Sequence, residues 1–176
     1  MTSAPRAASR ATLATVVLAW SIAACGAPSG NVSSPGPGGD AASATKALVV
    51  RALGGVGLQA VDSIKPYRPA ETASLIGAPR SVIQVQLPDD PDHGYVVIYS
   101  LGSAVTAEKA AFDQAAYVAS PAGAVQFPPG SHFVLRMVDT TVIFFTWSPG
   151  GSPDQRTHLI EGALNTIGIA VPVTGS

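Results

Sequence analysis

Residues 132–148, H-F-V-L-R-M-V-D-T-T-V-I-F-F-T-W-S, are the strongest indication of the fold in this chain. It contains two runs of β-branched, aromatic and large aliphatic residues that meet at Asp139-Thr140, a pattern typical of a β-hairpin with a two-residue loop. Such a loop places Val138 opposite Thr141. Because side chains alternate along a strand, one face of the hairpin carries five apolar side chains, and we expect the rest of the domain to pack on it: Phe133, Leu135, Met137, Val142 and Phe144.

The other face of the hairpin is mixed in character. It carries His132, Val134, Arg136, Val138, Thr141, Ile143, Phe145 and Trp147. Aromatic rings beside a guanidinium group make a good anchor for a peptide, glycan or lipid group. We therefore hypothesise that Arg136, Phe145 and Trp147 line a ligand-binding groove. The alternative interpretation is that a helix at 44–53, or another subunit, covers this face.

The rest of the chain predicts an α+β fold. Apolar periodicity and capping residues predict helices at 44–53, between Pro69 and Gly77, from a cap at Thr106 to residue 119, and from Ser152-Pro153 to Gly168. Alternating or continuous apolar runs predict strands at 58–64, 81–87, 94–100 and 170–173. Strand pairs joined by short loops imply an antiparallel sheet, with four to five strands and about three helices packed on it.

The chain begins with a segment typical of protein export. Arg6 and Arg10 give a basic start, and residues 11–24 are almost continuously apolar. This apolar run is shorter than the roughly 20 residues that a membrane-spanning helix needs. We interpret residues 1–24 as a signal peptide.

The export segment ends in Ile22-Ala23-Ala24-Cys25, which contains the only cysteine of the chain. These four residues resemble the lipobox of bacterial lipoproteins, in which the cysteine is diacylated and becomes the mature N-terminus. The resemblance covers the targeting segment alone. It implies lipidation of Cys25, a membrane anchor through diacylglycerol on that residue, and a location at the extracytoplasmic face of a bacterial cell envelope.

Residues 25–45 contain no large apolar side chains after Cys25 except Val32, and they are dense in Gly, Pro and Ser. A segment of this composition cannot bury enough surface to order itself, so we expect a flexible tether behind the lipidated cysteine. Residues 46–176 are then expected to form a single domain. With Cys25 lipidated, this domain has no disulfide and no cysteine ligand for a metal.

The charge of the mature chain bears on its partners. Residues 25–176 contain eight basic and eleven acidic residues, for a net charge of −3. This balance argues against nucleic acid as a partner, and a protein, peptide or glycan of the envelope fits better. The sequence leaves the oligomeric state open.

No motif for catalysis, a metal or a cofactor is complete in the sequence. Residues 88–93, P-D-D-P-D-H, form the densest acidic cluster, but no glutamate stands where a calcium loop would end, so a solvated hairpin loop is the better interpretation. The three histidines form no H-x-H or H-x-x-x-H pair, and there is no G-x-S-x-G turn. We therefore expect no metal, no cofactor and no catalytic residues.

Three functions remain open at this point. The preferred one is a non-catalytic, lipid-anchored binding or accessory module of the envelope. The first alternative is a small envelope hydrolase whose site is assembled only in the fold. The second is a structural protein that acts by oligomerising through edge strands or through the aromatic face of the hairpin.

Overall fold

The computed structural model describes residues 39–173, which lie in a compact unit spanning residues 33–176. Its centre is one antiparallel sheet with the strand order β1-β2-β3-β5-β4-β6. The expected mixed helix-and-sheet fold is therefore present, with six strands and five helices in the described part of the chain. The strands are β1 (Ala60–Asp62), β2 (Arg80–Val85), β3 (Tyr95–Ser100), β4 (His132–Val138), β5 (Thr141–Trp147) and β6 (Ile169–Ala170).

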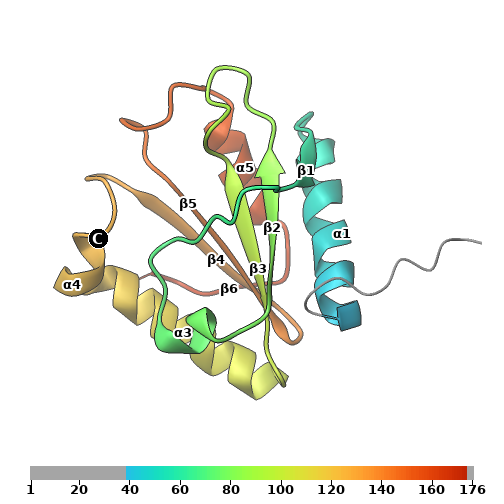
Figure 1. The fold of residues 1–176 in the computed structure, drawn as a ribbon, viewed down its shortest axis with the longest axis vertical. Helices are drawn as coiled ribbons and strands as arrows, with labels where there is room; N and C mark the ends of the chain where they lie inside the picture. The colour runs from blue at the N-terminus through green and yellow to red at the C-terminus, as the bar shows by residue number, and fades with distance from the viewer. Residues whose placement is uncertain (1–38, 174–176) are drawn as a thin grey trace, which may run out of the picture. The chain divides into compact units, whose positions relative to one another are not determined.

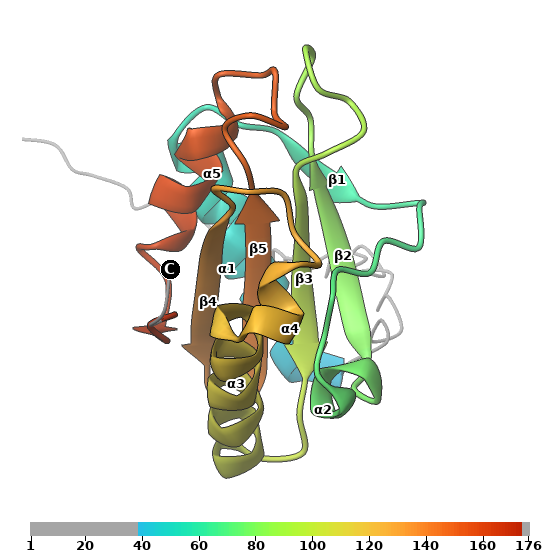
Figure 2. The same ribbon diagram turned by 90° about the vertical axis from the view of Figure 1, so that its left-hand side faces the viewer.

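Helices lie on both faces of the sheet (Figures 1 and 2). The first face is covered by α3 together with the two single-turn helices α2 and α4, and the second by α1 and α5. Their bounds are α1 (Gly39–Gly55), α2 (Ala73–Ile76), α3 (Ala104–Ala119), α4 (Pro121–Ala124) and α5 (Thr157–Leu164). The unit is a three-layer sandwich in which the sheet is the middle layer.

The hairpin of β4 and β5 has the register that the sequence predicts. Val138 pairs with Thr141, and every further pair follows up to His132 with Trp147. Asp139 occupies the left-handed region with φ 51°, which the first residue of a tight two-residue loop requires and which aspartate tolerates. The Thr141 hydroxyl donates to the Val138 carbonyl at 2.7 Å, which ties the two ends of the loop together.

The expectation that the domain packs on only one face of the hairpin is wrong. The mixed face is also covered, because Val49 and Leu53 of α1 and Ile160 and Leu164 of α5 pack against it. Phe145 lies in this second core and is 1% exposed. The alternative interpretation, in which the first helix covers this face, is confirmed. Strands that are buried on both sides place apolar residues on both faces, as β3 does with Tyr95–Tyr99.

Helix α3 packs close to the first face of the sheet because its buried side consists mostly of small residues. Its buried residues are Ala107, Ala110, Ala111, Gln114, Ala115 and Val118. Phe112, the one aromatic residue in the middle of this helix, is 49% exposed. Gln114 is fully buried, and its polar atoms bind the segment that precedes α2, at Ala70 and Thr72. This contact fixes one wall of the cleft described below.

Four helices begin at other residues than the sequence predicts. Helix α1 starts at Gly39, so residues 39–45 form its first turns and do not belong to a tether. Helix α2 starts at Ala73 and not at Pro69. Ser103 caps α3 in place of Thr106, and its hydroxyl accepts from the Thr106 amide at 3.1 Å. Helix α5 starts at Thr157, because the hydroxyl of Ser152 binds side chains of the fold instead of capping a helix.

The predictions on the N-terminal segment lie outside the described residues. These are the signal peptide at 1–24, the lipidation of Cys25 and the tether from Gly26 to residue 38. Within residues 39–173, no helix has both the length and the apolar character needed to cross a bilayer.

Candidate functional site

A cleft of about 370 Å³ opens at the end of the sheet where β5 ends and β3 and β4 begin. Four connecting segments border it, and they come from distant parts of the sequence: 67–70, 93–94, 126–131 and 148–157. Thr146 and Trp147, at the end of β5, complete its lining. Since β5 lies inside the sheet, the cleft lies at the end of the inner strands and away from the edge strands β1 and β6.

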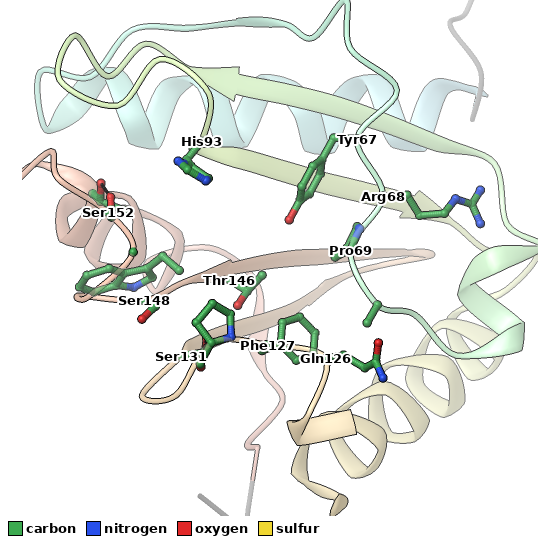
Figure 3. A pocket seen from close by; sticks show the side chains of 16 residues that line it. Tyr67, Arg68, Pro69, His93, Gln126, Phe127, Ser131, Thr146, Ser148 and Ser152 are labelled. Carbon is green, nitrogen blue, oxygen red and sulfur yellow. Dashed lines mark hydrogen bonds between the residues drawn. The ribbon is translucent and has the colours of Figure 1, made fainter. Parts of the chain in front are cut away.

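Figure 3 shows how the labelled side chains are distributed around the cleft. His93 and Tyr67 lie on one side, and Thr146, Ser131 and Phe127 lie on the other. The Tyr67 hydroxyl points into the space between them, whereas the Arg68 guanidinium points away from it. The cleft therefore presents rings, hydroxyl groups and one imidazole to a ligand.

The wall at 67–70 is held by side chains of α3 and the sheet. Gln114 Nε2 donates to the Ala70 carbonyl at 2.9 Å, and Gln114 Oε1 accepts from the Thr72 amide at 2.8 Å. The Tyr67 ring stacks on Tyr95 with centroids 4.5 Å apart and planes 15° from parallel. A wall with this support keeps its shape in the absence of a ligand.

A buried carboxylate lies behind the same wall. The side chain of Glu71 is fully buried, accepts from the Tyr99 hydroxyl at 2.5 Å and has Arg68 Nη1 3.1 Å from its Oε2. Burial raises the pKa of Tyr99, and its hydrogen bond to Glu71 raises it further, so this phenol stays protonated. Desolvation likewise raises the pKa of Tyr67, which keeps a hydroxyl donor in the cleft.

The opposite end of the cleft is organised by Asp90, which is 4% exposed. Its carboxylate contacts Nδ1 of His93 and accepts from the Ser152 hydroxyl at 2.9 Å. Ser152 in turn contacts the Thr157 hydroxyl at 2.6 Å. The expectation that 88–93 is merely a solvated hairpin loop is therefore wrong for Asp90, which is buried and links two loops.

A second carboxylate joins the same two loops. Asp154 is 2% exposed and accepts from the Asp89 amide at 3.2 Å, from the Arg156 amide at 2.9 Å and from the Arg156 guanidinium at 2.6 Å. The side-chain hydrogen bond from Arg156 is the main reason why the pKa of Asp154 lies below its usual range, and the backbone amides add to it. The loops at 86–94 and 148–156 thus form one wall.

Serine, histidine and aspartate meet here, but not in the order of a hydrolytic triad. In a triad the histidine lies between the acid and the serine and removes the serine proton. Here Asp90 lies in the middle, and the Ser152 hydroxyl donates a hydrogen bond to the carboxylate. Ser152 is therefore positioned as a structural link. When the His93 ring is neutral and donates its Nδ1–H to Asp90, its Nε2 is an acceptor.

The three residues of the sequence-based ligand hypothesis lie in different surroundings. Phe145 is part of the core under α1 and α5. Arg136 is 8% exposed. Its guanidinium donates to the carbonyls of Ile167 at 2.6 Å and Gly168 at 2.9 Å. Only Trp147 lines the cleft. Arg136 and Phe145 thus have structural contacts and lie outside the cleft lining.

Trp147 connects the cleft to α5. Its Nε1 donates to Glu161 Oε2 at 2.9 Å, and its ring lies 4.8 Å from that of His132 at an interplanar angle of 30°. His132 Nδ1 is also 3.4 Å from Glu161 Oε2. The ring of Trp147 is therefore fixed by one hydrogen bond and one ring contact.

Sequence reasoning missed most of the cleft. Tyr67 lies in a proline-rich segment without periodicity, and Thr146 was placed in a strand as an ordinary alternating residue. The signal for His93 was the polar loop 88–93, in which one aspartate precedes a histidine by three residues. No local sequence pattern predicts that these residues lie close together, because only the sheet brings their segments together.

The described residues contain no group of three or more His, Cys, Asp or Glu side chains that could hold a metal ion. The cleft itself offers hydroxyl groups, rings and one imidazole nitrogen. Comparison with protein-family models, with curated proteins and with solved structures finds no match for this chain.

Proposed function

We propose that this protein is a lipid-anchored binding module at the extracytoplasmic face of a bacterial envelope, and that the cleft at the end of β5 is its binding site. The lipobox-like residues 22–25 and the apolar segment before them support the anchor and the location. The observation that carries the binding role is the cleft of about 370 Å³, which rings and hydroxyl groups line. Small-molecule sites have this size and this mixture of surfaces.

The support for a binding role extends to the walls of the cleft. Gln114 holds the segment at 67–70, and Asp90 and Asp154 hold the loops around His93 and Ser152. A site that is already formed loses less conformational entropy when a ligand binds. Buried polar groups of this kind therefore favour affinity as well as stability.

The anchor is tested by mass spectrometry of the protein purified from a bacterial host that processes lipoproteins. We expect an acyl mass on Cys25 at the mature N-terminus. The Cys25→Ala variant is expected to lack this mass and to leave the membrane fraction. An unmodified cysteine in a correctly exported protein would contradict the anchor without affecting the cleft.

The binding site is tested by photo-crosslinking in intact cells. A photoreactive amino acid replaces Gln126, which is exposed at the rim of the cleft, and in a matched control it replaces Val105, which is 75% exposed on α3. We expect adducts from position 126 and none from position 105. Equal labelling at both positions would exclude a specific site at the cleft. Adducts that join only copies of this chain would favour the structural alternative.

A second candidate function is hydrolysis, which the contact between Asp90 and His93 favours. An imidazole oriented by a carboxylate can take a proton from water during attack on an ester. The purified protein is tested for release of p-nitrophenolate from p-nitrophenyl acetate, beside His93→Gln and the exposed-histidine control His158→Gln. Turnover that only His93→Gln abolishes would support a hydrolase. We expect equal background rates in all three proteins.

A further inference from the structure

We propose that the ligand of the cleft is a neutral saccharide, held by Tyr67, Thr146 and the His93 imidazole. This inference rests on the proposed binding function and deepens it.

The charged groups near the cleft are already paired inside the protein. The Arg68 guanidinium lies 3.1 Å from Glu71 Oε2 and 3.4 Å from the Ile76 carbonyl, and Figure 3 shows it turned away from the cleft. Asp90 is buried behind His93, and Asp154 is held by Arg156. A ligand with a formal charge would therefore lose hydration without gaining an opposite charge. The cleft favours a neutral ligand.

Apart from the exposed Gln126 amide at the rim, three polar groups that line the cleft have no hydrogen-bond partner among the described residues. These are the Tyr67 hydroxyl, the Thr146 hydroxyl and Nε2 of His93. Each hydroxyl can both donate and accept, and the imidazole nitrogen accepts. Sugar hydroxyl groups also donate and accept, so neighbouring hydroxyls of one sugar ring match this set.

The apolar part of the lining suits the C–H faces of a pyranose ring. Tyr67, Phe127 and Trp147 line the cleft, and each contacts a second ring that lies behind it: Tyr95, Phe133 and His132, with centroids 4.5, 4.9 and 4.8 Å apart. Rings held in this way lose little conformational freedom when a ligand packs against them. The combination of held rings and free hydroxyl groups distinguishes this cleft from a purely apolar pocket.

A peptide is disfavoured by the position of the cleft. Extended peptides gain affinity by adding a strand to an open sheet edge. The edges of this sheet are β1 and β6, whereas the cleft lies at the end of β5, which is paired on both sides with β3 and β4. A peptide in the cleft would lack this ladder of main-chain hydrogen bonds.

The test is isothermal titration calorimetry on the full-length protein with neutral oligosaccharides and a neutral peptide. The probes are tri-N-acetylglucosamine, cellotriose, maltotriose, xylotriose and hexaproline with blocked ends. Tyr67→Phe and Thr146→Val remove one hydroxyl each and keep the shape of the side chain. Tyr117→Phe on α3 and Thr166→Val after α5 are matched controls, because neither residue lines the cleft. Thermal unfolding of every variant checks that it is folded.

We expect at least one saccharide to bind, and we expect each cleft variant to weaken it by about fivefold, the effect of one neutral hydrogen bond. The two control variants should bind like the wild type. If none of the four saccharides binds, or if all five proteins bind with equal affinity, the proposal of a saccharide ligand is overturned. If hexaproline alone binds and the cleft variants weaken it, the ligand class is wrong but the binding cleft stands. Loss of site-specific crosslinking at position 126 would instead remove the binding function itself.

Discussion

The Asp90 carboxylate accepts a hydrogen bond from the Ser152 hydroxyl at 2.9 Å, although 62 residues separate the two in the sequence. Together with the Asp154 carboxylate, which accepts from the Asp89 amide, this contact joins the loop between β2 and β3 to the loop between β5 and α5. His93 is oriented by the same carboxylate. The wall of the cleft therefore depends on two buried carboxylates, and the position of its imidazole depends on one of them, Asp90.

Replacing Asp90 by alanine is expected to destabilise the domain by about 2 kcal/mol. Two hydrogen bonds to a buried charged group, from His93 and from Ser152, are lost. Urea denaturation followed by circular dichroism gives the free energy of unfolding. Asp89→Ala is the control, because its side chain is exposed and its backbone amide still binds Asp154. Equal stability of the two variants would show that Asp90 does not link the loops.

Two glycines near the C-terminus are expected to respond to alanine in opposite ways. Gly168 has φ +53°, and a Cβ there would lie 2.0 Å from the Met137 carbonyl oxygen, so Gly168→Ala should lower the free energy of unfolding by more than about 2 kcal/mol. Gly162 lies inside α5 with open space around its Cα, so Gly162→Ala should raise it by about 1 kcal/mol. Differential scanning calorimetry of both variants shows whether each substitution raises or lowers the stability. A stabilising Gly168→Ala would contradict the close approach of this turn to β4.

Arg136→Met should lower the free energy of unfolding by about 2 kcal/mol. The carbonyls of Ile167 and Gly168, at the end of the segment that follows α5, would lose their donors, and charge-assisted hydrogen bonds contribute about this much. Desolvation lowers the pKa of Arg136, as expected for a guanidinium group inside the fold. Chemical denaturation is compared with that of Arg51→Met, an exposed residue of α1. A stable Arg136→Met protein that loses ligand binding would restore Arg136 to the binding hypothesis.

The link through Asp154 predicts a loss of stability in acid. Its folded pKa lies below the ordinary value of 3.8, mainly because Arg156 donates to it. The unfolded chain therefore takes up the proton first as the pH falls. The stabilisation is fully present well above pH 3.8 and is lost as the pH drops below that value towards the folded pKa.

This pH dependence is measured as the unfolding temperature of the wild type and of Asp154→Asn between pH 7 and pH 2. The difference between the two proteins should be largest near neutral pH and should shrink below about pH 4, where the wild-type carboxyl begins to be protonated in the unfolded chain. A constant difference over the whole range would show that the ionised form of Asp154 does not stabilise the fold. High salt should reduce the difference only in part, because Asp154 is 2% exposed.

The hairpin at 132–148 and its register are predictable from local sequence, because a two-residue loop and a period-two pattern leave no other pairing. The mixed fold class and the antiparallel sheet are also predictable, since these depend on local periodicity and short connections. The sequence does not show which helices cover which face of the sheet. Strands β3 and β5 are apolar on both sides, so their pattern does not indicate which helix packs on each side.

The cleft depends on long-range packing. The sheet brings the ends of distant strands together, and so it places Tyr67, His93 and Thr146 around one cleft. Their spacing in the sequence does not predict this. The same holds for Asp90 and Ser152, which the sequence presents as a solvated loop residue and a helix cap. Their burial follows from the packing of two loops against each other, an effect of long-range contacts that local propensities do not contain.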